Sequence, residues 1–352
     1  MKSKKPASLV PPLGARGPIR IGTRDSELAL WQAHTVEKKL NDLGYKTEII
    51  AVKSEGDIIL DKPLYELGIT GIFTKTLDVA MISGQVDIAV HSMKDVPTAL
   101  PQGIVQAAVL ERANTLDILV HKGNLDFLED SGTIATGSLR RQAQWLNKYP
   151  NHKVVDLRGN VNTRMQKLQD NDWSGAVFAA AGLERLGLTP SPSPHERQRT
   201  GEAKERGASS ASYIINSPSF GGVGEALDWM IPAPAQGAMV VVAMAEDEFC
   251  REAVSELNDI ETEVCTHIER QFLRRLEGGC TAPIGALATY NEEEDTIHFE
   301  GVLFSIDGQQ KIAINKVVPI EEWKNLGYHS AEEILNNGGT ELMKTIKETL
   351  KK

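Results

Sequence analysis

The chain has 352 residues, of which 41% are hydrophobic and 24% are charged, a composition typical of a soluble globular protein. Its length favours two or three domains over one small core, and no apolar run approaches the roughly 18 residues that a membrane span needs. The formal net charge of −10 argues against broad nucleic-acid binding, although it leaves room for a local basic cleft. An odd count of three cysteines does not indicate a disulfide framework and favours a reducing cytoplasm.

The first part of the chain alternates strand-like and helix-like segments. We predict a flexible tail at residues 1–18, because its apolar stretch is too short for a signal peptide. "PIRIGT" is a predicted strand, and the helix that follows has Ser26 as its N-cap and Gly44 as its stop. The strand "KTEIIAV", the helix "IFTKTLDVAMISG" and the strand "VDIAVHS" come next. Strands separated by helices predict a mostly parallel α/β sheet.

The same order of elements then restarts. "GTIATGSLRRQAQWLNKY", "HKVVDLRGNVNTRMQKLQD" and "SGAVFAAAGLERLGL" each show a strand that leads into a helix. This repetition predicts a second α/β domain whose turns face those of the first. The Ser-, Pro- and Gly-rich residues 190–226 have no clear period, and we predict an exposed, disordered insertion there. The remaining chain predicts a smaller α+β domain, with helices at Asp247–Leu257, at Glu261–Leu276 and from about Ser330.

The predicted strand-to-helix turns concentrate basic and hydroxyl side chains. These are Arg24, Ser26, Ser138, Arg140, Arg141, Arg158 and Arg164. In open α/β sheets, ligands bind at the carboxyl ends of strands, and arginine forks bind carboxylates in a bidentate manner. An acidic chain that gathers arginines there is expected to bind a compact polyanion. The alternative is that these arginines pair with the chain's own carboxylates on a solvated surface.

Asp95 follows the buried strand "VDIAV", beside Lys94 and shortly before Pro97. A carboxylate at this position suits stabilisation of a developing cation or transfer of a proton. The local stretch taken alone favours a turn-capping role for Asp95, so both interpretations stay open.

The cysteines divide into two kinds. Cys250 and Cys265 lie within predicted helices and are expected to be buried. Cys280 follows two glycines at a predicted helix end, where it should be accessible. A helix C-terminus disfavours a thiolate, so this thiol is better suited to one lasting alkylation than to a nucleophilic role in every cycle. The Cys and His spacings do not match a metal site, and we expect no metal.

Eight stretches together resemble the porphobilinogen deaminase (hydroxymethylbilane synthase) family. In chain order they are "RIGTRDSELALWQA", "SEGDIILDKPL", "DIAVHSMKDVPTALPQG", "TGSLRRQAQWL", "LRGNVNTRMQKL", "AAAGLERLGL", "PAPAQGA" and "LEGGCTAPIGA". They span the chain from about Arg20, and only the tail and the 190–226 insertion fall outside the match. Each short motif is weak alone, but the combination is highly specific.

The resemblance implies a transferase that condenses four porphobilinogen molecules head to tail into hydroxymethylbilane, with release of four ammonia, in tetrapyrrole (heme) biosynthesis. It implies a dipyrromethane cofactor held through a thioether on Cys280. It also implies a cytoplasmic monomer with porphobilinogen as its substrate and with no nucleic-acid or membrane partner.

The resemblance further implies an α/β fold of two periplasmic-binding-protein-like domains and a smaller C-terminal α+β domain. We expect domain 1 at 19–114 and 236–255, domain 2 at 115–235, and domain 3 at 256–352.

Residue roles follow from the same resemblance. Asp95 matches the family's catalytic aspartate. The matches to groups that bind the carboxylates and polar atoms of cofactor and substrate are Arg24, Ser26, Ser92, Lys94, Thr136, Ser138, Arg140, Arg141, Arg158, Arg164, Arg185 and Gln236. Two positions depart from the family: Thr70 stands where many members have lysine, and Gly137 where they often have serine. Lys75, one helical turn after Thr70, is a candidate to replace the missing lysine in part.

A non-catalytic, two-lobed binding protein for a small dicarboxylate is the alternative that the α/β lobes alone would allow. Such a protein would need neither Asp95 at its cleft nor Cys280 within reach of it, and it would have no use for a third domain.

Overall fold

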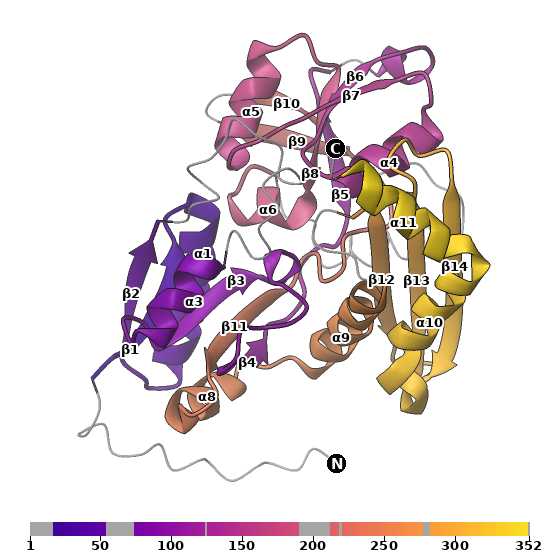
Figure 1. The fold of residues 1–352 in the computed structure, drawn as a ribbon. Helices are drawn as coiled ribbons and strands as arrows, with labels where there is room; N and C mark the ends of the chain where they lie inside the picture. The colour runs from indigo at the N-terminus through magenta and orange to yellow at the C-terminus, as the bar shows by residue number, and fades with distance from the viewer. Residues whose placement is uncertain are drawn as a thin grey trace.

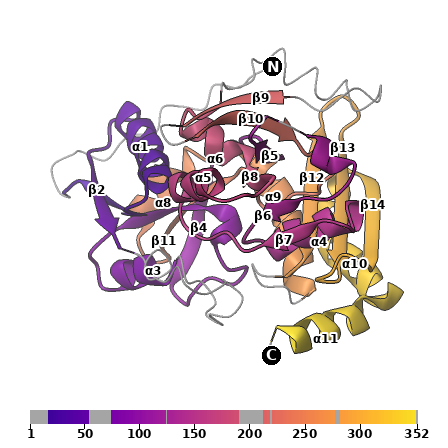
Figure 2. The ribbon, with the colours of Figure 1, turned by 90° about the horizontal axis from the view of Figure 1, so that it is seen from above.

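The computed structural model describes residues 17–53, 74–123, 125–189, 212–217, 220–276 and 282–350. Within these ranges the chain forms a five-stranded, a six-stranded and a three-stranded sheet, each with its own helices. The unit built on the first sheet and the C-terminal unit lie on opposite sides of the molecule, and the second sheet lies between and above them (Figures 1 and 2). This confirms the predicted class of two α/β units and a smaller α+β unit.

The first sheet combines strands from two distant parts of the chain. Its order is β2 (Thr47–Val52), β1 (Ile19–Arg24), β3 (Ile88–Ser92), β11 (Met239–Met244) and β4 (Ile104–Val109), and its helices include α1 (Glu27–Asp42), α3 (Lys75–Ile82) and α8 (Glu248–Ser255). The Ser26 side chain accepts a hydrogen bond from the Ala29 N–H, which confirms it as the N-cap of α1. Gly44 has φ +92° just after this helix, as its predicted stop requires.

The second sheet is built in the same way. Its order is β7 (Lys153–Val155), β6 (Thr133–Ala135), β8 (Gly175–Ala179), β5 (Asp117–His121), β10 (Phe220–Ala226) and β9 (Ser212–Ser217), and its helices include α4 (Leu139–Lys148), α5 (Val161–Asp170) and α6 (Ala180–Arg185). Each of these three helices directly follows one of the strands β6, β7 and β8, as the repeated pattern predicts.

The prediction of a mostly parallel sheet holds only in part, because β2, β1, β3 and β4 of the first sheet run in one direction and β11 runs against them. Strand β1 pairs in parallel with β2 and β3, and β6 pairs in parallel with β7 and β8. The remaining ladders of both sheets are antiparallel, including those of β11 with β3 and β4. The chain leaves the first unit and later returns to it, and the returning strand runs against its neighbours.

The predicted disorder of 190–226 needs correction in its last part. Strands β9 and β10 pair with each other, and β10 also pairs with β5. Because β10 is rich in glycine, its local sequence has low strand propensity, and its order comes from pairing with a strand about a hundred positions away. Residues 190–211 lie outside the described ranges.

The C-terminal unit packs helices on one three-stranded antiparallel sheet. The strands are β12 (Ile284–Asn291), β13 (Thr296–Phe304) and β14 (Lys311–Pro319), and the helices are α9 (Ile260–Arg275), α10 (Leu326–Ile334) and α11 (Thr340–Thr349). Its core includes Phe272 of α9 against Phe299 of β13, with ring centroids 5.3 Å apart. The last helical region begins at Leu326 rather than near Ser330, and it is kinked at Gly338, where φ is +101°.

Candidate active site

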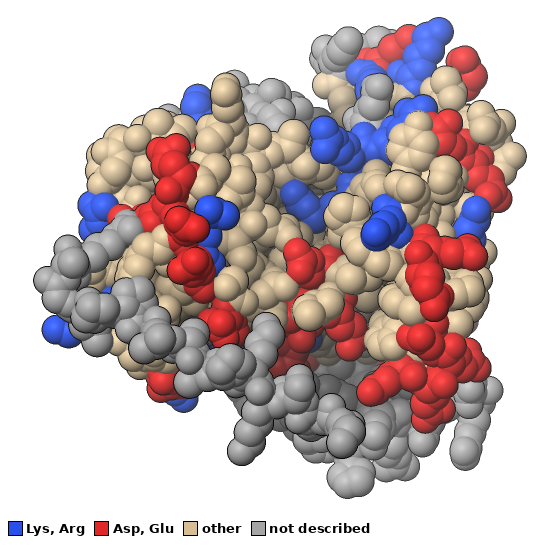
Figure 3. All heavy atoms as spheres, turned by 90° about the horizontal axis from the view of Figure 1, so that it is seen from below, with Lys and Arg blue, Asp and Glu red and all other residues tan. Residues whose placement is uncertain are grey.

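A cavity of about 630 Å³ lies between the first and second units, where strand ends from both meet. Its basic lining side chains are Arg24, Lys53, Lys94, Arg141, Arg158, Arg164 and Arg185, and its acidic ones are Asp25, Glu27 and Asp95. Seven basic groups against three acidic ones make the cavity electropositive in a chain of net charge −10. The face drawn in Figure 3 carries several separate acidic patches; its largest group of basic side chains lies to the upper right of the centre, and others are scattered, some of them at the left edge. The cavity therefore suits a small polyanion.

Asp95 reaches the cavity from the short 3-10 helix η2 (Met93–Asp95) at the end of β3. The Met93 N–H donates to the Ala238 carbonyl at 3.0 Å, and the Val96 N–H donates to the Met93 carbonyl at 3.2 Å. The side chains of Met93 and Val96 are buried on either side of Asp95. The turn that presents this carboxylate is thus anchored at both ends.

Lys94 lies beside Asp95 and faces residues 235–237, the segment before β11 that joins the two units and that we call the hinge. Its ammonium donates to Gln236 Oε1 at 3.2 Å. Burial, helped by the nearby Arg141 charge, lowers the pKa of Lys94 to about 8, although Asp95 and Asp117 oppose the shift. An anion bound in the cavity would favour the protonated form of this side chain.

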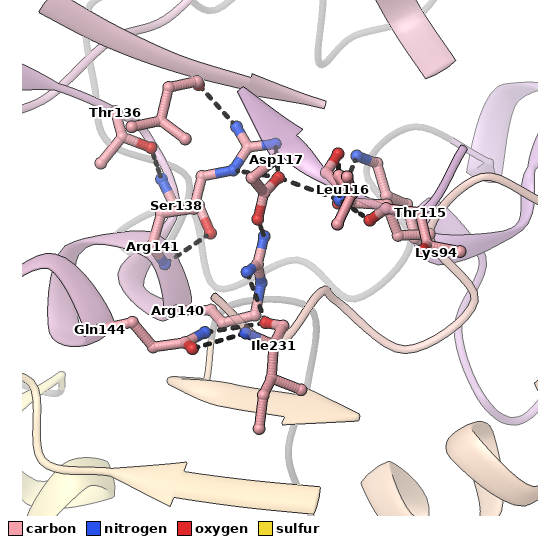
Figure 4. A network of polar contacts seen from close by, with 12 residues as sticks. Lys94, Thr115, Leu116, Asp117, Thr136, Ser138, Arg140, Arg141, Gln144 and Ile231 are labelled. Carbon is pink, nitrogen blue, oxygen red and sulfur yellow. Dashed lines mark hydrogen bonds and ion pairs between the residues drawn. The ribbon is translucent and has the colours of Figure 1, made fainter. Parts of the chain in front are cut away.

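A buried carboxylate, Asp117, organises the arginine pair of α4. Arg140 and Arg141 approach it from opposite sides (Figure 4). Arg141 Nη2 lies 2.8 Å from Asp117 Oδ1, and Arg140 Nη2 lies 2.8 Å from Oδ2. Gln236 Nε2 also donates to Oδ1 at 2.9 Å. Burial alone would raise the pKa of Asp117, but the two guanidinium groups and Gln236 hold it at about 2.

This network separates two arginines that the resemblance groups together. Arg140 also donates to the Ile231 carbonyl at 2.8 Å, and it is not among the residues that line the cavity. Arg141 donates to the Val177 carbonyl at 2.8 Å and does line the cavity. The Arg140 guanidinium therefore binds only groups of the protein in this structure, whereas Arg141, which is also paired with Asp117, lines the cavity.

Two further arginines close the cavity from the second unit. Arg164 of α5 donates from Nε to the Gly159 carbonyl at 2.7 Å, and burial together with the Arg141 and Arg158 charges lowers its pKa to about 10. Arg185 of α6 donates to the Gly237 carbonyl at 2.7 Å and stands over the Trp31 ring at 5.6 Å. Burial lowers the pKa of Arg185 to about 10 as well. These guanidinium groups lie close together in a partly desolvated cavity. A bound anion would reduce the repulsion between them.

The other predicted site residues are placed as follows. Ser26 and Ser92 line the cavity. Thr136 and Ser138 do not line the cavity. The Thr136 hydroxyl accepts a hydrogen bond from the Ser138 N–H, and the Ser138 hydroxyl caps α4 by accepting one from the Arg141 N–H. Gln236 is fully buried in the hinge network, and Lys75 is exposed at the first position of α3. Cys280, which the resemblance marks as the attachment point, lies outside the described residues, as does Thr70.

The buried character predicted for Cys250 and Cys265 is confirmed. Burial, with the nearby Glu269 charge, raises the pKa of Cys265 to about 12, so this thiol stays protonated.

Sequence reasoning missed Asp117, Lys53 and Arg270. Asp117 begins a short buried strand that has no local signal of function, and Lys53 follows a predicted strand without a motif. A lone aspartate before the apolar run "ILV" is the one sign that Asp117 offered, because a buried carboxylate needs partners.

The fold and the site together define a class: a two-lobed α/β protein with a third unit, whose cavity carries seven basic and three acidic side chains, Asp95 among them, and suits a small polyanionic molecule. Two family models cover this arrangement. The model for the porphobilinogen deaminase dipyromethane cofactor binding domain matches residues 19–252, and the model for the porphobilinogen deaminase C-terminal domain matches residues 263–336. The chain belongs to the porphobilinogen deaminase family. Porphobilinogen deaminase is hydroxymethylbilane synthase, so this is a family of transferases.

Curated relatives match over nearly the whole chain. The porphobilinogen deaminase of Chlorobium phaeobacteroides (strain BS1) is 36% identical over 343 residues, which cover 94% of this chain and 98% of the relative. That of Desulfitobacterium hafniense (strain DSM 10664 / DCB-2) is 38% identical over 340 residues, which cover 96% and 100%. Among solved structures, an ancestral cationic amino acid solute-binding protein aligns over 68% of this chain and 88% of its own at 15% identity, with a TM-score of 0.36, too distant to add to the assignment.

Proposed function

We propose that this protein condenses four porphobilinogen molecules head to tail into hydroxymethylbilane and releases four ammonia. The observation that carries the proposal is the meeting of Asp95 with Arg24, Lys94, Arg141 and other cations in one cavity of about 630 Å³. This volume is within the range of roughly 300–1,000 Å³ that small-molecule sites occupy.

The arginines explain how the substrate is held. Porphobilinogen carries an acetate and a propionate, and every added ring brings two more carboxylates. Arginine forks bind such groups through two parallel hydrogen bonds. Lys94, Arg164 and Arg185, whose pKa values are all lowered by burial, gain most from an anionic partner. We infer that these cations fix the position of each ring by its carboxylates.

The same cations fit the dipyrromethane that the matched domain is named for. Its carboxylates would be held by basic residues of the cavity wall, among them Arg141, Arg158 and Arg164. When bound, the group supplies the pyrrole carbon at which the new chain begins. We propose Cys280 as its attachment point through a thioether. The sequence places Cys280 four positions after Leu276, the C-cap of α9.

Asp95 is the candidate catalytic group. When the amino group of porphobilinogen leaves as ammonia, the C–N bond breaks and a cation remains on the methylene carbon. A carboxylate in a partly desolvated cavity stabilises that cation, because its charge is already in place when the cation forms. The new C–C bond then joins this carbon to the unsubstituted ring carbon of the last pyrrole in the growing chain, and the proton lost from that ring carbon passes to the departing ammonia or to water.

The finer assignments rest on family membership. We propose that the reaction belongs to tetrapyrrole biosynthesis leading to heme. We propose domain 1 at 19–114 and 236–255, and the place of β11 in the first sheet supports it.

A cytoplasmic location, a monomeric state and the lack of nucleic-acid or membrane partners stay predictions. Among the described residues, no helix combines the length and apolar character that crossing a bilayer requires. Family membership does not favour the alternative of a non-catalytic dicarboxylate-binding protein.

The experiment that tests the proposal replaces Asp95 by Asn. The neutral amide cannot balance the cation, so kcat should fall by roughly 10²–10³-fold while the covalently bound pyrroles remain. The measurement is the rate of porphobilinogen consumption, with the intact mass as a check on cofactor content. Asp42→Asn, an exposed aspartate at the end of α1, serves as the control and should keep the wild-type rate. Wild-type turnover in Asp95→Asn would remove Asp95 from the mechanism.

A further inference from the structure

Arg270 of α9 reaches out of the C-terminal unit to the turn that carries Asp95. Its guanidinium donates from Nη1 to the Met93 carbonyl at 3.2 Å and to the Val96 carbonyl at 2.9 Å. Its Nη2 donates to the Pro97 carbonyl at 2.7 Å. These residues flank Asp95 on both sides in the sequence. One side chain from another unit thus binds the backbone before and after the candidate catalytic residue.

The position of Arg270 is itself fixed by its neighbour. Glu269 is fully buried, and its carboxylate accepts from both Nη atoms of Arg112 at 2.7 and 2.9 Å. It also accepts from the Ala235 N–H at 2.6 Å and from the Ala288 N–H at 2.8 Å. This turn of α9 is therefore tied at once to the first unit, to the hinge and to β12. The contacts of Glu269 thus hold in place the turn of α9 from which the Arg270 side chain extends.

We propose that Arg270 is a positioning residue that holds the Met93–Pro97 turn so that Asp95 faces the cavity. The inference rests on the proposed function of Asp95. Three carbonyls that point at one guanidinium cannot reorient without breaking charge-assisted hydrogen bonds, so the backbone of the turn stays in one conformation. Since α9 also leads into the segment with Cys280, the same helix connects the Asp95 turn to the proposed attachment point.

The chemistry requires arginine in particular. A planar fork with several N–H donors can serve three acceptors on two sides, whereas a lysine ammonium is a single compact point charge. Arg270→Lys should therefore restore only part of what Arg270→Gln loses.

The first test compares Arg270→Gln and Arg270→Lys with wild type. In Arg270→Gln, kcat should fall roughly 10- to 100-fold, the scale expected for a misplacement of about 1 Å, while KM changes less than about threefold because the carboxylate-binding arginines are untouched. Arg270→Lys should fall between the two. Arg274→Gln, an exposed arginine on the same helix, is the matched control and should keep wild-type kcat.

The second test asks whether Arg270 acts through Asp95. Arg270→Gln should cost far less in the Asp95→Asn background than in wild type, because a turn that no longer presents a carboxylate loses little by moving. Hydrogen exchange of the Val96 amide, which donates to the Met93 carbonyl, should speed up in Arg270→Gln and stay unchanged in Arg274→Gln.

The outcomes separate the two ideas. Wild-type kcat in Arg270→Gln, or losses that are fully additive with Asp95→Asn, would overturn the role of Arg270 and leave that of Asp95 intact. Wild-type kcat in Asp95→Asn would overturn the proposed function of Asp95 whatever Arg270 does. If Arg270→Gln does not fold, Arg270→Lys carries the test, and wild-type kcat together with unchanged Val96 exchange in that variant would overturn the inference.

Discussion

Asp117 has no exposed surface, yet its carboxylate holds two guanidinium groups and the amide of Gln236. Removing its charge would leave Arg140 and Arg141 buried without their counter-charge. Breaking a buried ion pair in this way typically costs about 3–5 kcal/mol. We therefore expect Asp117→Asn to lower the free energy of unfolding by about 3 kcal/mol or more. Urea denaturation followed by tryptophan fluorescence measures it.

The control for this variant is Asp172→Asn, because Asp172 is exposed in the same unit. Surface substitutions of this kind usually stay within about 0.5 kcal/mol of wild type. A loss below about 1 kcal/mol in Asp117→Asn would contradict the role of Asp117 as the centre of the arginine network.

The lowered pKa of Lys94 leads us to expect that kcat/KM depends on pH. Burial and Arg141 lower its pKa to about 8, so the free enzyme loses this cation as pH rises through about 8. Below that pH the ammonium is present and can bind a carboxylate. The ratio kcat/KM, which reports the free enzyme, should therefore fall above about pH 8. In Lys94→Arg the side chain stays protonated and this fall should disappear; a flat wild-type profile through that region would argue against the assignment.

At the scale of single elements, the surroundings of Gly137 leave no room for a side chain. A Cβ at Gly137 would lie 2.7 Å from the backbone oxygen of Leu157, closer than real contacts allow. The connection after β7 passes too near for a side chain. We expect Gly137→Ser to destabilise the second unit by about 1–3 kcal/mol, as overpacking does. The midpoint of thermal unfolding measures this.

Gly17→Ser is the matched control, because a Cβ there meets nothing within 4 Å. An unchanged midpoint in Gly137→Ser would mean that the segment after β7 shifts freely and that the glycine has no packing role.

Elements with local signals could be predicted from the sequence. The capping serine and stop glycine of α1 are confirmed, because helix caps depend on neighbours in the chain. The sequence carries no distinctive strand signal at β4, β5 and β11. A short apolar run does not distinguish a buried strand from other buried segments, and these strands are stabilised by distant partners.

In the site, too, the residues that could be predicted are those with a local signal in the sequence. The arginines and Asp95 could be found because they follow predicted strands, and the cavity brings most of them together. The commitment of Arg140 to Asp117 could not be predicted, since it depends on which buried carboxylate the fold places beside it. The same holds for Arg270, whose three acceptors lie more than 170 positions away in the sequence.

At the scale of the whole molecule, the three units meet around the hinge. Glu269 of the C-terminal unit binds the backbone of Ala235, and Gln236 binds Asp117 and Lys94. The cavity, the hinge and α9 thus share one continuous set of buried polar contacts. Charge-assisted contacts of this kind couple the positions of the three units.

The central claim is that this chain carries two linked pyrroles on Cys280 and extends them with porphobilinogen. The intact mass of the purified protein tests it most directly. We expect a mass about 420 Da above that of the sequence, equal to two porphobilinogen units less two ammonia, and no such increment in Cys280→Ser. The account would be contradicted if the purified protein had the bare sequence mass and if added porphobilinogen neither modified Cys280 nor was consumed.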